Sequence, residues 1–142
     1  MMPYMDRTIT SLEISTDQIA EFEHEWIGAW NAHDIDRILA HYRDDVRFTS
    51  PFAARAGARD GTLRGLAALR SYFERALATY QDLHFEPIAA LRGVDSVALH
   101  YRTVEGREAI EVMQLDRKWQ VHRVFAHYTS APSQVADRRN HR

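Results

Sequence analysis

The chain has 142 residues, a length that suits one domain built around one hydrophobic core. Its net charge of −2, with histidines neutral, gives no overall field that would favour nucleic acid or an anionic membrane. The absence of cysteine excludes disulfides, thiolate catalysis and cysteine-ligated metals. No apolar run approaches the length of a membrane span, and the first residues lack the apolar core of a signal peptide. We therefore expect a cytoplasmic protein that binds neither nucleic acid nor membrane.

The N-terminal part predicts a helix after a flexible arm of residues 1–14. Ser15 and Gln18 have the spacing of a capping box, so the domain, residues 15–130, should begin with a helix there. Apolar residues then recur at helical spacing. They are Ile19, Phe22, Trp26, Ala29 and Trp30.

A second helix and a strand are predicted next. Asp34 can cap the second helix, whose apolar stripe runs from Ile35 to Tyr42. A turn at residues 44–45 leads to alternating apolar and polar residues at 46–50, a pattern typical of a half-buried strand. Pro51 lacks the N–H that a strand ladder needs and should end the strand. Residues 53–61 are rich in Ala, Gly and Arg, and we interpret them as a loop over the mouth of a pocket.

The second half predicts one more helix and then strands. The helix covers about residues 65–80. The strands cover about residues 83–91, 95–104, 108–116 and 119–129. Short turns separate these strands, so they should form an antiparallel meander, and the domain should be α+β. The polar residues 131–142 favour a disordered tail over a functional basic arm.

The face on which Glu111 lies depends on the turn around Gly106. A three-residue loop, Val104–Gly106, would pair Glu111 with Leu99 and give one clearly apolar face. A two-residue turn would slip the register by one and place His100 opposite Glu111. We favour the three-residue loop.

In that register Glu111 is the one carboxylate on an apolar face. Burial disfavours the charged form of a carboxyl group and raises its pKa. Such a group in a pocket can be a general acid, a general base or a hydrogen-bond donor. The alternative is a structural glutamate paired with an arginine or a histidine.

Three segments resemble the nuclear transport factor 2-like superfamily, within it the branch of SnoaL-like polyketide cyclases and ketosteroid isomerases. They read AWNAHDIDRILAHYRDDVRFTSP, GLAALRSYF, and AIEVMQLD with the closing FAHYT. The resemblance implies three helices packed in the concave face of a strongly curved, mixed and mostly antiparallel sheet, a cone-shaped α+β barrel. It also implies an apolar cavity and often a homodimer through the outer face of the sheet. The fold hosts many functions, so it does not fix a reaction.

The resemblance also places the roles that ketosteroid isomerases use. Their oxyanion-binding tyrosine corresponds to Trp26, their aspartate base to Ser50, and their protonated aspartate to Glu111. A supporting tyrosine is retained as Tyr42, and another is replaced by Phe73. Ser50 has no carboxylate and cannot replace the aspartate as the base. The indole N–H of Trp26 can donate a hydrogen bond but cannot take up and return a proton as a phenol can. We therefore predict that the chain is not a true ketosteroid isomerase.

The remaining pocket residues follow from the predicted faces and from the resemblance. Alongside Glu111 as the acid or base, the expected pocket residues are Trp26, Trp30, Tyr42, Ser50, Phe52, Phe73, Leu99, Tyr101, Met113, His122 and Tyr128. His122 and Tyr128 are expected to share one face of the last strand with Val124. A plain core role for the two tryptophans remains the alternative.

No metal or cofactor is expected. His24-Glu25 is not followed by a second histidine at His-Glu-x-x-His spacing, and Ser50 lacks the Gly-x-Ser-x-Gly elbow of serine hydrolases. Two functions remain. One is a cofactor-independent isomerase, cyclase, dehydratase or hydrolase that acts on a small hydrophobic substrate. The other is a non-catalytic domain that binds a ligand or dimerises.

Overall fold

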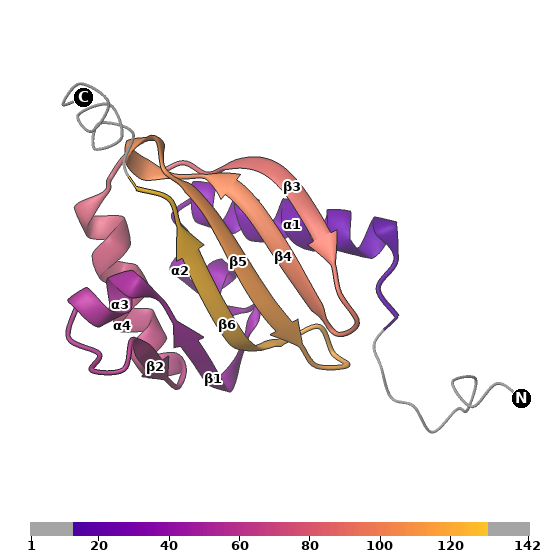
Figure 1. Cartoon of the computed structure of the whole chain (residues 1–142), viewed down its shortest axis with the longest axis horizontal. Coiled ribbons are helices and arrows are strands. Elements are labelled where there is room, and N and C mark those ends of the chain that lie inside the picture. The colour runs from indigo at the N-terminus through magenta and orange to yellow at the C-terminus, as the bar shows by residue number, and fades with distance from the viewer. Residues whose placement is uncertain (1–12, 131–142) are drawn as a thin grey trace, which may run out of the picture.

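The computed structural model describes residues 13–130, which form four helices and one six-stranded sheet (Figure 1). The expected arm lies outside the described residues except for positions 13 and 14, of which Ile14 is buried. The expected tail, residues 131–142, lies outside them entirely. The helices are α1 (Thr16–Asn31), α2 (Ile35–Leu39), α3 (Pro51–Arg55) and α4 (Leu66–Thr79). None of these described helices has the length and apolar character that a bilayer crossing requires.

The sheet is mixed and open. Its strands are β1 (Tyr42–Thr49), β2 (Thr62–Arg64), β3 (Glu86–Arg92), β4 (Ser96–Arg102), β5 (Glu108–Leu115) and β6 (Val121–Tyr128). Their order is β2-β1-β6-β5-β4-β3, and the pair β1 and β6 is parallel while the others are antiparallel. The two edges, β2 and β3, do not meet, so the sheet does not close into a barrel.

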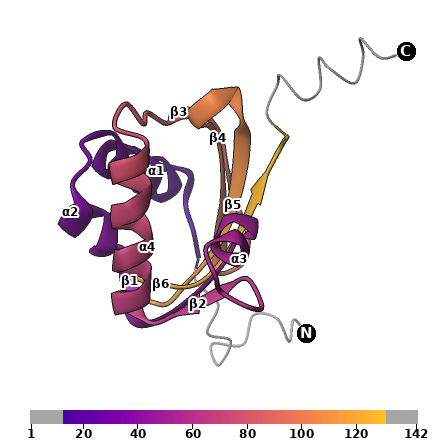
Figure 2. The same ribbon diagram turned by 90° about the vertical axis from the view of Figure 1, so that its left-hand side faces the viewer.

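The helices α1, α2 and α4 cover one face of the curved sheet, which confirms the α+β prediction (Figure 2). The core fills the space between them. Its largest fully buried side chains include Trp26, Ile38, Leu69, Leu99, Tyr101 and Met113. Both predicted caps are present. Ser15 and Gln18 form the capping box of α1, and the Asp34 carboxylate accepts from the backbone N–H of Arg37.

The region around β1 differs from the sequence prediction at three points. Helix α2 ends at Leu39, so Tyr42 belongs to β1, and Asp44 and Asp45 lie within the strand instead of a turn. Asp45 is held there by Arg43, whose Nη2 lies 2.7 Å from a carboxylate oxygen. Pro51 does not simply end the strand but begins α3, a position where its missing N–H costs no hydrogen bond.

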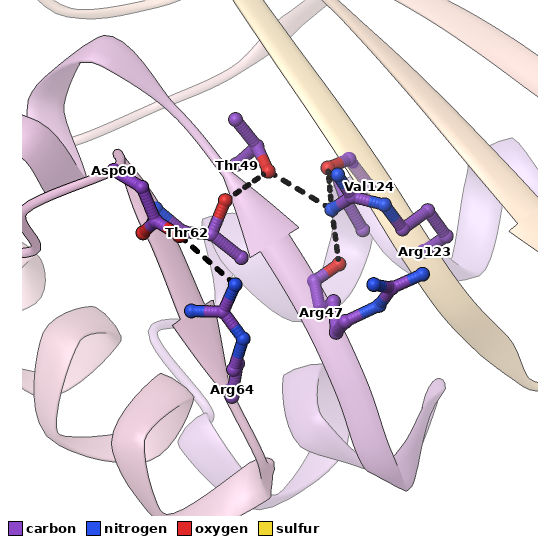
Figure 3. A network of polar contacts seen from close by, with 7 residues as sticks. All are labelled: Arg47, Thr49, Asp60, Thr62, Arg64, Arg123 and Val124. Atoms are coloured by element: carbon purple, nitrogen blue, oxygen red, sulfur yellow. Dashed lines mark hydrogen bonds and ion pairs between the residues drawn. The ribbon is translucent and has the colours of Figure 1, made fainter.

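Side chains tie the end of β1 to both neighbouring strands (Figure 3). The hydroxyl oxygen of Thr49 lies 2.7 Å from that of Thr62 on β2. Arg123 on β6 donates from Nη1 to the same Thr49 oxygen at 2.9 Å. These contacts fix the point at which the chain leaves the sheet and turns into Ser50 and α3.

Candidate active site

The hairpin between β4 and β5 decides where Glu111 points. Glu105 and Gly106 both have positive φ, 59° and 69°, and the backbone N–H of Thr103 donates to the carbonyl of Arg107 at 2.8 Å. Leu99 is therefore paired with Glu111, and His100 with Ile110. The three-residue loop is confirmed, and Glu111 lies on the inner face of the sheet.

Glu111 is a buried carboxyl with one partner. Only 4% of it is exposed, and the hydroxyl of Tyr101 donates to its Oε2. Its Oε1 is buried without a hydrogen-bond partner among the described residues. No arginine or histidine pairs with it there, so the geometry does not support the alternative of a structural ion pair.

Burial sets the electrostatics of this carboxyl. Removal from water raises the pKa of Glu111 from 4.5 to about 7, and the hydrogen bond from Tyr101 opposes part of that rise. The group therefore changes charge near neutral pH, as a general acid or base should. Burial also raises the pKa of Tyr101 well above its ordinary value, and the nearby Glu111 charge adds to that effect.

A cavity of about 360 Å³ opens beside Glu111. This volume lies in the lower part of the range of about 300–1,000 Å³ that small-molecule sites occupy. Most of its wall is apolar or aromatic, and its polar groups are few. The expected pocket residues that line it are Trp30, Phe52, Phe73, Tyr101, Glu111 and Tyr128.

Five other expected pocket residues lie behind this wall. Leu99 and Met113 are fully buried on the inner face of the sheet. The indole N–H of Trp26 donates to the hydroxyl of Tyr42 at 3.0 Å, deep in the core. Ser50 is buried as the N-cap of α3, where its Oγ accepts from the backbone N–H of Phe52 at 3.2 Å.

His122 does not share the face of Val124 as predicted. The pairing of β5 with β6 shifts at this point, because Leu115 is paired with Val121 while Gln114 is paired with Arg123. His122 is the extra residue of this bulge, so the inward positions are Val121 and Val124, both fully buried. His122 is not among the residues that line the cavity.

The indole of Trp30 lies at the cavity with its N–H unused by the described residues. Its Nε1 is buried without a hydrogen-bond partner among the described residues, and its ring lines the cavity. The ring packs edge-on against Phe73, with centroids 4.7 Å apart. The indole that could donate to a bound molecule is thus that of Trp30, whereas the N–H of Trp26 is already used by Tyr42.

The sequence prediction missed several residues that contact the cavity. Tyr72 on α4 lines it with a phenol whose pKa is raised by burial and lowered in smaller part by interaction with Ser50. Phe85 lines it from the segment before β3, where Asn31 at the end of α1 exchanges hydrogen bonds of 3.0 and 2.6 Å with its backbone. Arg107 lines it from the hairpin loop, directly before β5. Among these residues only Tyr72 had a usable signal, its spacing of four residues to Ala76 on the same helix.

Metal-binding geometry does not occur in the part of the chain that the structure describes. Nowhere in residues 13–130 do three or more His, Asp or Glu side chains come together as a metal site requires.

Comparisons with known proteins place the fold. The SnoaL-like domain model matches residues 24–135. A SnoaL-like protein of unknown function from Burkholderia thailandensis is 44% identical, with a TM-score of 0.80, over 83% of this chain and 100% of that one. An NTF2-like protein of unknown function from Cytophaga hutchinsonii is 15% identical, with a TM-score of 0.61, over 87% and 97% of the two chains.

One more solved structure is similar in fold. SalBIII, an epoxide hydrolase/cyclase-like enzyme with a role in pyran ring formation in the polyether salinomycin, is 18% identical, with a TM-score of 0.65. The alignment covers 80% of this chain and 92% of SalBIII. At this identity the likeness shows the fold alone. The comparison with curated proteins gave no match.

Proposed function

This chain belongs to the SnoaL-like family, and from that premise we propose that it is a cofactor-independent acid–base enzyme that acts on a small hydrophobic substrate. The observation that carries the proposal is the Oε1 of Glu111. This oxygen is buried, has no hydrogen-bond partner among the described residues, and belongs to a carboxyl that lines the cavity. A carboxyl with a pKa of about 7 can both take and return a proton near neutral pH.

In the proposed mechanism Glu111 removes a proton from carbon or oxygen of the substrate. Tyr101 holds the Oε2 of the carboxylate, which leaves Oε1 to face the substrate. The negative charge that develops on the substrate is stabilised by donors on the cavity wall. The candidate donors are the indole N–H of Trp30, which has no partner among the described residues, and the phenols of Tyr72 and Tyr128, which also interact with Ser50.

The reaction type is an isomerisation, cyclisation, dehydration or hydrolysis, because each can proceed by such a proton transfer without a cofactor. The similarity in fold to SalBIII, described as epoxide hydrolase/cyclase-like, is consistent with this range. The chain is not proposed to be a true ketosteroid isomerase. Ser50 has no carboxylate and caps α3, and the indole N–H of Trp26 donates to Tyr42, so neither supplies the base or the oxyanion donor.

The test uses 5-nitrobenzisoxazole, a small apolar probe that reports a buried base. A base removes its ring C–H proton, the C–H electron pair forms a nitrile, and the N–O bond breaks to release a coloured nitrophenolate. We expect the protein to accelerate this reaction with a rate that rises through a pKa of about 7. In Glu111→Gln the rate should fall to that of the reaction in buffer.

The matched control is Glu108→Gln, the same change on the same strand. Glu108 lies three residues before Glu111, pairs with His100 at 2.8 Å, and does not line the cavity. This variant should keep the wild-type rate. If the wild-type protein binds the probe without accelerating the reaction, the proposed base is wrong, and the alternative of a non-catalytic binding domain is favoured.

We also propose that two copies associate through the outer face of the sheet. Leu91, Ile110 and Phe125 are large apolar side chains on β3, β5 and β6 that remain 56%, 40% and 38% exposed. Burial of this surface against a second copy would remove it from water. Sedimentation velocity should show a dimer, and a monomer at high protein concentration would contradict the proposal.

A further inference from the structure

The entrance to the cavity carries a guanidinium that the proposed proton transfer does not use. Arg107 directly precedes β5, and two backbone hydrogen bonds across the hairpin loop fix its position. Its N–H donates to the carbonyl of Val104 at 3.2 Å, and its carbonyl accepts from Thr103 at 2.8 Å. The side chain lines both the main cavity and an adjoining smaller cavity of about 180 Å³.

The guanidinium of Arg107 is largely withdrawn from water. Only 16% of the side chain is exposed, and the group stacks over the ring of Phe52 at 5.1 Å from its centroid. Its Nε is buried and has no hydrogen-bond partner among the described residues. A buried N–H of a cation without an acceptor is unfavourable, so this edge of the guanidinium is built for a partner that comes from outside.

The remaining contact of this guanidinium is weak. Glu105 lies 3.5 Å from Nη2 through its Oε1, and its side chain is 54% exposed. A carboxylate that approaches side-on takes the N–H groups of Nε and Nη2 together, as a planar guanidinium favours. Glu105 contacts only one of the two, and it can move into water when a better placed carboxylate arrives.

Charge at the entrance favours an anion. Arg75 lines the main cavity, and Arg55 lines the smaller one and lies 5.2 Å from the ring centroid of Phe52. With Arg107 these make three positive groups against the single carboxylate of Glu105. The rest of the lining is mostly aromatic and aliphatic and includes Glu111, so a molecule with one anionic end and one apolar end matches these groups.

We propose that the ligand of this cavity is a small aromatic or aliphatic carboxylic acid whose carboxylate pairs with Arg107 while its apolar body lies toward Glu111. The inference deepens the proposed function, because it rests on the same cavity and names the substrate class. Arg107 is then a specificity-determining residue, and Glu105 is an internal competitor for the guanidinium.

The test compares the binding of 2-naphthoate with that of 2-naphthamide, which has nearly the same shape and no charge. Calorimetric titration at pH 6 keeps Glu111 largely neutral, because its pKa is about 7. The wild-type protein should bind the carboxylate about tenfold more tightly than the amide, since hydrogen bonds between ions are stronger than neutral ones. Arg107→Gln should abolish this preference, and Arg107→Lys, which keeps the charge but loses the fork, should retain only part of it.

Two further variants keep the test decisive. Glu105→Gln should increase the preference for the carboxylate, because it removes the competing anion. Arg102→Gln, at an exposed arginine on the neighbouring strand β4, should leave the preference unchanged. Equal affinities for the two probes in wild type, a preference that survives Arg107→Gln in folded protein, or no binding of either probe would overturn the proposal.

The outcome is separable from that of the proposed function. Glu111→Gln should keep the preference for naphthoate, because the carboxylate contacts Arg107 and not Glu111. If the protein binds naphthoate more tightly than naphthamide but does not catalyse the ring opening of 5-nitrobenzisoxazole, only the role of Glu111 as the base is contradicted. If the protein catalyses this ring opening but binds naphthoate and naphthamide equally well, only the role of Arg107 is contradicted.

Discussion

At pH 9 Glu111→Gln should raise the free energy of unfolding by about 3 kcal/mol more than it does at pH 4. The reason is that an ionised carboxylate is unfavourable at this buried position. The folded state raises the pKa of Glu111 from 4.5 to about 7. One pKa unit corresponds to about 1.36 kcal/mol, so ionisation costs the folded wild-type protein about 3 kcal/mol. Glutamine has the shape of the side chain without the charge.

The direction of the pH dependence follows from the raised pKa. Below about pH 4.5 the carboxyl is neutral in both the folded and the unfolded protein, so wild type keeps its full stability there. Wild type loses stability as the pH rises from there through about 7, because the unfolded protein releases this proton more readily than the folded protein does. The free energy of unfolding, from urea titrations at several pH values, should therefore fall in wild type relative to Glu111→Gln over this window. Glu108→Gln, with its exposed carboxylate, should not reproduce the difference. A difference that is constant from pH 4 to pH 9 would show that Glu111 does not change charge in this range.

Tyr101→Phe should raise the pKa of Glu111 above its wild-type value. The Tyr101 hydroxyl is the one hydrogen-bond donor to this carboxyl among the described residues, and it lowers the pKa against the larger effect of burial. A hydrogen bond to a charged group contributes roughly 1.5–3 kcal/mol, so its loss should raise the pKa by roughly one to two units. Phenylalanine keeps the ring that packs against Phe85 and Trp26.

The ring opening of 5-nitrobenzisoxazole makes this shift measurable. The midpoint of its pH–rate profile should move to higher pH in Tyr101→Phe, so the rate at pH 7 should fall while the rate at high pH is kept. Tyr72→Phe is the matched control, since Tyr72 also lines the cavity but does not bond to Glu111. A midpoint that stays in place or moves to lower pH would show that Tyr101 does not hold the ionised carboxylate.

The parts of the site that local chemistry determines were predictable from the sequence. The capping side chains of Ser15 and Asp34 mark the starts of two helices. The apolar alternation on both sides of Gly106 favoured the register of the three-residue loop over a two-residue turn, and the structure has that register, with Glu111 inward. Each of these features is determined by interactions between residues that are close together in the sequence.

The parts that depend on distant contacts were not predictable. An alternation of period two cannot reveal the bulge that takes His122 out of the inner face. Helical spacing put Trp26 and Trp30 on the same face, but only the packed structure shows that Tyr42 takes the N–H of Trp26 and leaves that of Trp30 free. Arg107 reads as an ordinary hairpin residue, because Phe52, on which it stacks, is far away in the chain.

The most direct test of a poised carboxyl in the cavity is the ionisation of Glu111 itself. Carbon-13 NMR of the side-chain carboxyl groups, with the Glu111 signal assigned by its loss in Glu111→Gln, follows this single group as the pH is changed. The structure predicts a midpoint at about pH 7. A midpoint near 4.5, the ordinary value for a glutamate, would contradict it and with it the acid–base role of Glu111.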